Sequence, residues 1–323
     1  MRRRLFWAAM LVALLDPSAR LVGRLAGIPH LLWGDLAGPP LMAVGRAALT
    51  GTVVAIVAVE LFRQTKLGRA RAWNDGQHLR RAVALGAGLA VFFTALILVA
   101  RPKMLYKNAW SLAHQGNYDG ARRELERLLR EYPRHVDGYL ERAWVRGRLR
   151  DYQGSVADAT RAIELDGRNA HAYYQRGWAR SGLKEYESAI ADLTESIERD
   201  PDRWDAYVDR AFARARVGDF DGAIADATTA IRLDPTAATA YYNRGFARAA
   251  ADDLEGAIAD FSRVLDLEPK DADAYLGRGR VRYRLGDLRG AVRDWEAASQ
   301  LDPDVRREVE TELAQARAKL TSG

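Results

Sequence analysis

Prolines recur at a regular spacing in the second half of this chain. These prolines are Pro133, Pro201, Pro235, Pro269 and Pro303. Each gap is 34 residues or a multiple of 34, and Gly167 stands at the one step without a proline. A period of this length indicates a supersecondary unit that is copied several times and stacked on its neighbours. Such arrays usually present an extended binding surface rather than a catalytic pocket.

Six repeat units follow when each of these residues is placed at position 32 of a 34-residue unit. The units span residues 102–135, 136–169, 170–203, 204–237, 238–271 and 272–305. Bulky residues then fall at position 4 and small residues at position 8, as with Tyr173 and Gly177 in the third unit. Positions 17 and 20 repeat this pairing, as with Phe220 and Ala223 in the fourth unit. Bulky and small columns at fixed spacing are typical of a packing interface that every unit repeats.

Each unit is predicted to contain two helices. Position 16 mostly holds good N-cap residues such as Asp219, and Gly218 just before it suits the end of a preceding helix. Apolar residues then recur at one-turn spacing from Ala223 to Ile231, and Pro235 cannot continue that helix. The unit is therefore a helical hairpin, which buries its apolar face only by stacking on its neighbours. The expected fold class is an all-α helical-hairpin solenoid.

These columns resemble the pattern of the tetratricopeptide repeat family, which the segment NRGFARAAADDLEGAIADFSRVLDLEP at 243–269 matches closely. Position 11 departs from the family pattern, because it is often aromatic there and is arginine in units two to six of this chain. The resemblance implies a right-handed superhelix with a concave groove that holds protein or peptide partners. Beyond the sixth unit, apolar residues such as Val309 and Ala316 recur among many charges, which predicts a capping helix over 306–323.

The first third of the chain differs in composition from the repeats. Residues 1–101 carry 13 Lys and Arg against 4 Asp and Glu, whereas the remainder carries 36 against 39. Because the excess basic charge lies beside apolar segments rather than on the repeats, it indicates a membrane and not a nucleic acid. We therefore expect residues 1–101 to form a membrane region that precedes the solenoid.

Two segments of this region are candidate transmembrane helices. Residues 82–100 are 19 uncharged and mainly apolar positions, close to the ~20 needed to cross a bilayer. Residues 41–62 form a weaker candidate, in which Arg46 and Glu60 bound an apolar core and could snorkel. The apolar run 5–15 is short for a span, so it could be a signal-peptide core, an interfacial helix or a short span continued by the next apolar residues.

Basic residues predict the orientation of these spans. Six Lys and Arg lie between 63 and 81, and three follow the last span, so we expect the loop 63–81 in the cytoplasm and the solenoid on the other side. The chain has no cysteine, so redox chemistry does not indicate its compartment. The expectation is an integral membrane protein whose repeat domain is non-cytoplasmic.

The sharpest functional pattern is an aromatic column at position 9. Positions 5, 9 and 12 of the first helix share one face, and in the resembled family this face lines the concave groove. The residues predicted to line it are Tyr106, Trp110, Trp144, Tyr174, Trp178, Phe212, Tyr242, Phe246, Arg280, Tyr283 and Arg284. An apolar or aromatic-bearing segment suits these rings, and the arginines could orient an acidic or carboxylate-ended peptide. The alternative is that the rings only fill space between neighbouring helices.

Arginine and acid form a second set of columns. Positions 7 and 11 are arginine in units two to six, as with Arg210 and Arg214, and position 23 is acidic in every unit, as with Asp226. Repetition of opposite charges in phase predicts ion pairs between packed helices. An anion-binding strip is the alternative.

No catalytic, metal or cofactor site is recognisable in the sequence. The five histidines lack metal-ligand spacing, cysteine is absent, and no glycine-rich phosphate loop follows a strand. We therefore expect no enzyme and no cofactor. The function expected is a membrane-anchored scaffold or adaptor that holds a protein or peptide segment in its groove, in assembly at the cell envelope. The alternatives are a structural component that self-associates through its membrane helices or solenoid edges and, more weakly, a transporter subunit.

Overall fold

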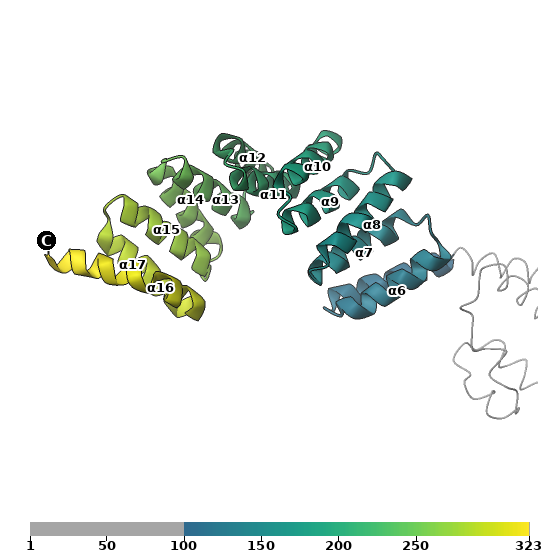
Figure 1. Ribbon diagram of the computed structural model, residues 1–323, viewed down its shortest axis with the longest axis horizontal. Coiled ribbons are helices and arrows are strands. Elements are labelled where there is room, and N and C mark those ends of the chain that lie inside the picture. The colour runs from purple at the N-terminus through teal and green to yellow at the C-terminus, as the bar shows by residue number, and fades with distance from the viewer. Residues whose placement is uncertain (1–99, 323) are drawn as a thin grey trace, which may run out of the picture. The chain divides into compact units, whose positions relative to one another are not determined.

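The computed structural model describes residues 100–322, and these residues form helices and short connections without any strand (Figure 1). A helix over 100–114 comes first. It is followed by α6 (Tyr118–Glu131), α7 (Val136–Arg148), α8 (Tyr152–Leu165), α9 (Ala170–Gly182), α10 (Tyr186–Arg199) and α11 (Trp204–Arg216). The remaining helices are α12 (Phe220–Leu233), α13 (Ala238–Ala250), α14 (Leu254–Leu267), α15 (Ala272–Arg284), α16 (Leu288–Leu301) and α17 (Pro303–Ser322). The prediction of an all-α array of helical hairpins is confirmed.

The chain divides into two compact units. The first comprises Met1–Asn108 and Arg130–Pro133, and the second comprises Ala109–Leu129 and Arg134–Gly323. In the described part of the first unit, Arg101 pairs with Glu131, with 2.9 Å between the Arg101 Nε and Glu131 Oε2 atoms. The second unit holds the helical array.

The predicted membrane segments lie almost wholly outside the described residues. The apolar run 5–15 and the predicted spans 41–62 and 82–100 fall there, apart from residue 100, so they stay predictions. Within residues 100–322, no helix combines the length and the apolar character that crossing a bilayer requires.

The second helix of each hairpin begins where the sequence predicts a cap. Asp151, Asp219, Asp253 and Asp287 each accept a hydrogen bond from the backbone N–H three residues later, which satisfies a donor at the helix start. Gly218 just before such a cap has φ 87°, in the left-handed region where glycine is favoured. The hairpin turns are therefore specified locally.

The hairpins stack so that one set of helices faces inward. We call α7, α9, α11, α13 and α15 the A helices, and α8, α10, α12, α14 and α16 the B helices. Successive A helices contact one another, whereas successive B helices make at most marginal contact. In a curved stack the elements at smaller radius lie closer together, so the A helices line the inner side of the arc that α7 to α16 follow in Figure 1. We call this side the inner face.

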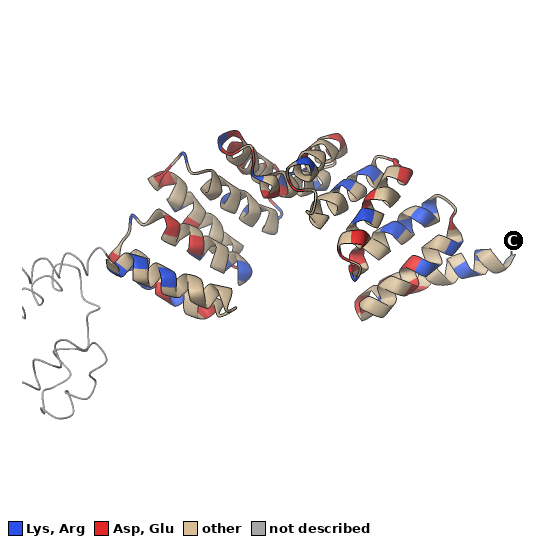
Figure 2. Cartoon of the chain, turned by 180° about the vertical axis from the view of Figure 1, so that it is seen from behind, with Lys and Arg blue, Asp and Glu red and all other residues tan. Residues whose placement is uncertain are grey.

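The predicted ion pairs hold each hairpin together and join it to the hairpin before it. Asp226 of α12 accepts two hydrogen bonds from Arg210, at 2.8 and 2.7 Å, and one from Arg214 at 2.8 Å. Arg210 also donates to the Thr194 hydroxyl of the preceding unit at 3.0 Å. The arginine pair and its acid recur in every unit from the second to the sixth, with the acids Asp158, Asp192, Asp226, Asp260 and Asp294. Basic and acidic residues are accordingly interleaved along the array (Figure 2). The pairing interpretation is confirmed.

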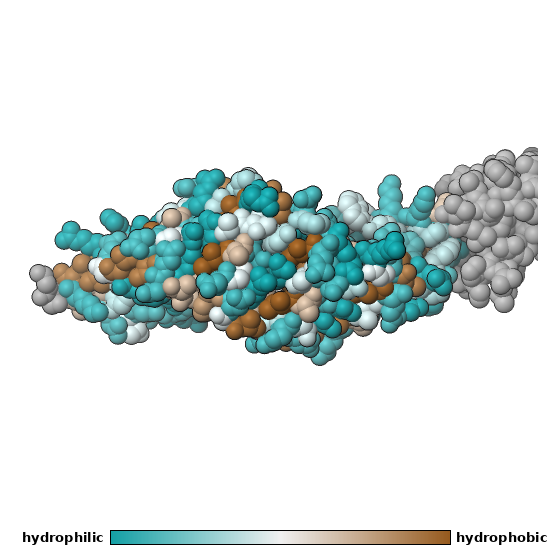
Figure 3. Space-filling model, turned by 90° about the horizontal axis from the view of Figure 1, so that it is seen from above, coloured by the Kyte–Doolittle hydropathy of each residue, from teal (hydrophilic) through white to brown (hydrophobic). Residues whose placement is uncertain are grey.

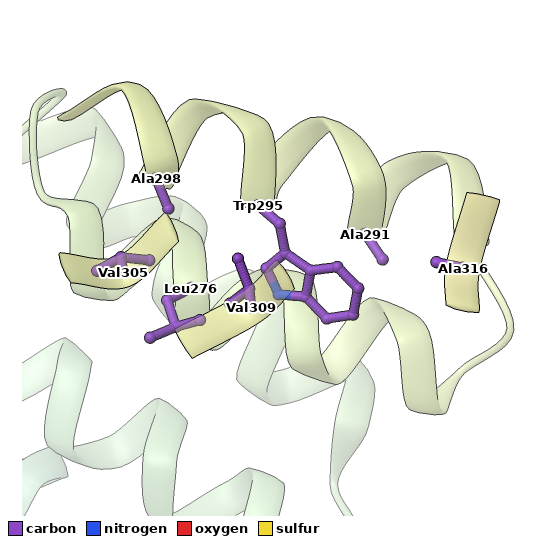
Figure 4. Close-up of a cluster of buried hydrophobic side chains, with 7 residues drawn as sticks. All are labelled: Leu276, Ala291, Trp295, Ala298, Val305, Val309 and Ala316. Carbon is purple, nitrogen blue, oxygen red and sulfur yellow. The ribbon is translucent and has the colours of Figure 1, made fainter. Parts of the chain in front are cut away.

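The last helix closes the C-terminal end of the array. Trp295 of α16 is 1% exposed and packs in a cluster with Leu276 of α15 and with Val305 and Val309 of α17 (Figure 4). Exposed charges occupy much of the rest of α17. A helix with one apolar stripe and a polar remainder covers an apolar end that would otherwise face water.

Candidate functional site

The aromatic column at position 9 belongs to the first helix of units one to five, and its rings remain at least partly accessible. Trp110 is 46% exposed, Phe212 41% and Phe246 46%, whereas Trp144 and Trp178 are half-buried. Large apolar side chains are usually covered in a folded chain, so accessible rings at equivalent repeat positions form an unusual surface. Elsewhere, exposed apolar side chains occur as separate patches among polar ones (Figure 3).

These rings also pack between neighbouring units. Trp144 meets Tyr118 edge-on with 5.9 Å between ring centroids, and Phe212 meets Tyr186 at 6.2 Å. Trp178 contacts Tyr152 in the same way at 6.0 Å, and a Cβ at Gly147 would lie only 2.1 Å from the Trp178 ring. Each of these rings therefore has one edge in an interface between units. Each ring packs against the preceding unit on one side and remains at least partly accessible on the other.

A stack of rings marks the N-terminal end of this surface. The centroids of Trp110 and His114 lie 3.8 Å apart, and His114 in turn stacks on Trp144 at 6.0 Å. Tyr118 lies edge-on to Trp144, and Arg148 lies over Tyr118 at 5.7 Å. The first two aromatic rings of the column thus form one continuous cluster with a histidine between them.

Position 5 contributes only tyrosines to the surface. Tyr174 and Tyr242 are half-buried on α9 and α13, whereas Leu140 and Val208 at the equivalent positions are 5% exposed and belong to the core. Tyr106, the predicted site residue at position 5 of the repeat unit 102–135, is half-buried. Tyrosine therefore alternates with a buried aliphatic residue at this position.

The predicted residues at the C-terminal end are engaged within the protein. Arg280 pairs with Glu308 at 2.7 Å, and Arg284 donates to the Ala249 carbonyl and to Asp252 at 2.6 and 2.8 Å. The Tyr283 hydroxyl accepts a hydrogen bond from Lys319. Because these groups already have partners, they offer little to an acidic segment.

Sequence reasoning missed a polar row beside the tyrosines. Asp209 of α11 accepts a hydrogen bond from the Tyr174 hydroxyl of α9. Gln175 is 4% exposed, and its Nε2 atom lies 3.4 Å from Nε2 of His171. His171 occupies position 2, and Gln175 and Asp209 occupy position 6. The residue types at these two positions differ between units, so they form no repeated column. Asp209 nevertheless precedes Phe212 by three residues, the spacing of one helix face, and this spacing could have revealed it.

Burial shifts the titration of these groups. Desolvation raises the pKa of Asp209 to about 7, the Tyr174 hydrogen bond acts in the opposite direction, and nearby Asp205 raises it further. Burial also raises the pKa of Tyr174 and, with the positive charge of Arg203, lowers that of His171. No group of three potential metal-ligating side chains occurs among the residues that the structure describes.

Comparison with known proteins identifies the repeat. The tetratricopeptide repeat family matches five overlapping segments, at 106–170, 140–203, 174–238, 208–271 and 239–305. No curated protein matched the sequence.

Among solved structures, PilW, a widely conserved type IV pilus biogenesis factor, is similar with a TM-score of 0.61 and 18% identity over 65% of this chain and 98% of that one. A tetratricopeptide repeat protein from Parabacteroides merdae ATCC 43184 has a TM-score of 0.53 and 16% identity over 68% of this chain and 92% of that one. MamA has a TM-score of 0.46 and 24% identity over 54% of this chain and 95% of that one. The likeness to the first two extends to the fold, and the family match covers most of the chain. The chain belongs to the tetratricopeptide repeat family.

Proposed function

We propose that this protein is an interaction scaffold that holds a segment of a partner protein along the inner face of its A helices. The observation that carries the proposal is the column of accessible rings, with Trp110, Phe212 and Phe246 between 41% and 46% exposed. The family generally provides non-enzymatic scaffolds for protein interaction, which supports the same assignment.

The rings supply enough apolar area for a specific but reversible complex. Covering about 80 Å² on each of three rings, at ~25 cal/mol per Å², contributes about 6 kcal/mol before the cost of association. Aromatic side chains commonly dominate the binding energy of protein interfaces. The expected partner segment is therefore apolar or aromatic-bearing.

Crosslinking from the rings tests the proposal. A photoreactive phenylalanine analogue at Phe246 of the full-length protein should capture a partner protein, because that side chain lies on the proposed surface. The same analogue at Glu198, an exposed residue of the B helix α10, is the control and should capture none. Equal capture from both positions would reject the surface assignment. Crosslinks from Phe246 to a second copy of the chain alone would favour the self-associating alternative.

We further propose that the scaffold is anchored in a membrane and works in assembly at the cell envelope. The apolar segments 41–62 and 82–100 and the basic residues between 63 and 81 support this placement, with the repeats on the non-cytoplasmic side. Because the chain lacks cysteine, Glu198→Cys would introduce a single thiol on α10. Labelling of that thiol in intact cells by a membrane-impermeant maleimide is the expected result. Labelling only after lysis would place the repeats on the cytoplasmic side.

A further inference from the structure

Two neighbouring A helices bring an acid, a tyrosine and several polar side chains together near the middle of the inner face. The residues are His171, Tyr174 and Gln175 from α9, and Arg203, Asp205 and Asp209 from α11 and the turn before it. We call them the α9–α11 polar cluster. His171 stacks on Tyr174 with 5.9 Å between centroids, Arg203 lies 4.9 Å from the Tyr174 centroid, and the Tyr174 hydroxyl donates to Asp209.

Asp209 differs from the buried acids at position 23 because it has no arginine partner. In units two to six, the acid at position 23 contacts two arginines, and Arg203 pairs with Asp205 at 3.4 Å. Asp209 has no ion pair within residues 100–322, and the adjacent Arg210 is directed to Asp226 instead. The Asp209 side chain is partly exposed, so a ligand can reach it, yet burial raises its pKa to about 7. A poorly solvated carboxylate without a counter-charge is costly, and a cation relieves that cost.

Gln175 supplies a second, independent indication of a missing ligand. It is 4% exposed and occupies on α9 the repeat position that Asp209 occupies on α11. Its Oε1 atom has no hydrogen-bond partner in the described part of the chain, and neither has Nδ1 of His171. Buried polar atoms are nearly always hydrogen-bonded, so an acceptor left without a donor beside Tyr174 points to a group that the chain does not provide.

The charges of the inner face agree with a cationic ligand. Positions 2 and 6 of the A helices carry five acids, which are Asp137, Glu141, Asp205, Asp209 and Asp273. The arginines at the opposite end of these helices are engaged, as Arg284 is with Asp252 and Arg216 with the Tyr186 ring. Within the cluster, Arg203 and Asp205 offset each other, so an ionised Asp209 gives the cluster a net negative charge, which favours a basic partner.

We propose that the α9–α11 polar cluster binds a lysine or arginine side chain of the partner segment, an inference that rests on the proposed scaffold function. The cationic head pairs with Asp209, and its remaining N–H groups have Gln175 Oε1 as a further acceptor. Trp178 and Phe212 follow Tyr174 and Asp209 by about one helical turn, so they lie on the same face and cover the aliphatic stem. The groove thus selects an aromatic or apolar segment with a basic residue near its centre.

Selection from a random peptide library tests this specificity. The probe is a library of 12-residue peptides displayed on phage, selected on the full-length protein and on its Asp209→Asn variant. Peptides selected by the natural chain should be enriched in aromatic residues and in Lys or Arg. Selection on Asp209→Asn should keep the aromatic enrichment and lose the basic one. A selected basic peptide should bind Asp209→Asn at least ~10-fold more weakly, as for the loss of one partner of a desolvated charge pair.

Asp221→Asn is the matched control, because it removes the same charge from an exposed site on α12 of the same unit. Tyr174→Phe is a second test, since it removes the hydroxyl from Asp209 while keeping the ring. Aromatic enrichment without Lys or Arg, or basic enrichment that persists in Asp209→Asn, would overturn the inference and leave the scaffold function standing. If no selected peptide loses affinity when Phe212 or Phe246 is replaced, both the inference about the polar cluster and the proposed scaffold function are overturned.

Discussion

At the scale of single residues, the array depends on buried charges that repeat with the hairpins. Asp192 is 3% exposed and accepts hydrogen bonds from Arg176 and Arg180 of the same unit. Through Thr160, Arg176 also contacts the unit before. One carboxylate therefore fixes two arginines and, through one of them, the register of two hairpins.

Asp192→Asn should lower the free energy of unfolding by about 3 kcal/mol, because it leaves two arginines without their common counter-charge. Chemical denaturation followed by circular dichroism measures the loss. Asp202→Asn is the control, since Asp202 is exposed in the turn that precedes α11. If both variants unfold at the same denaturant concentration as the natural chain, the pairs do not stabilise the array.

Asp209 should make stability depend on pH in the opposite sense to an ordinary paired acid. Its pKa is raised from 3.8 to about 7, so the folded chain keeps a proton that the unfolded chain releases. The contribution of Asp209 is favourable at low pH and is lost as pH rises from about 4 to about 7. Asp209→Asn should therefore stabilise the protein, by roughly 2 kcal/mol more at pH 8 than at pH 4 after allowing for partial exposure. A stability difference that does not change with pH would contradict this, as thermal melts at both pH values would show.

At the scale of the element, the hairpin turns differ in how well their residues suit the left-handed backbone. Gly116, Gly218 and Gly286 occupy this conformation in units one, four and six. Arg150, Lys184 and Asp252 take the same conformation in the others, where a side chain is disfavoured. The 34-residue pattern therefore tolerates an unfavourable residue in half of these turns, because the helices on both sides are held by packing.

Lys184→Gly should stabilise the protein by about 1 kcal/mol, because Lys184 is exposed and has φ 64°. Lys184→Ala serves as the comparison that removes the side chain without relieving the backbone. Gly218→Ala, at φ 87°, should destabilise by a similar amount. Equal denaturation midpoints for the glycine and alanine variants at 184 would show that the backbone conformation carries no cost there.

At the scale of the whole molecule, each described hairpin relies on contacts with the hairpins next to it. Interior helices such as α11 contact helices of both neighbouring units, whereas α17 packs chiefly on α16 and also contacts α15. The stability of such an array is approximately a sum of unit and interface terms. Loss of an end helix therefore weakens the next hairpin first.

Hydrogen exchange should follow this arrangement. The backbone amides of α11 and α12 should exchange more slowly than those of α16 and α17, since opening the end of an array breaks one interface and opening its middle breaks two. Removing α17 by ending the chain after Asp302 should speed exchange in α16, because Trp295 would lose its contact with Val309. Uniform exchange along the array, or no change in α16 on truncation, would indicate a single cooperative unit instead.

Much of the fold could be predicted because its determinants repeat. Prolines and glycines delimit the hairpins, caps such as Asp219 start the helices, and the charge columns predict the pairing of Arg210 with Asp226. The aromatic column at position 9 could also be predicted because it repeats, whereas the α9–α11 polar cluster could not, because its residues vary from unit to unit. Arg284 matches an expected groove position, yet its bonds to Asp252 and the Ala249 carbonyl depend on how two units meet.

The repeated pattern alone was enough to predict an array of helical hairpins, since periodic apolar residues and local caps act within one unit. The pattern does not show which face of a ring stays accessible or that the partly buried Asp209 has no ion pair in the described residues; the packing of neighbouring helices sets both. Phe212 has one edge against Tyr186 of α10, and Asp209 lies beside Tyr174 of α9, both in the preceding unit. The physical reason is that exposure and solvation depend on the spacing of neighbouring helices, which a pattern within one helix does not specify.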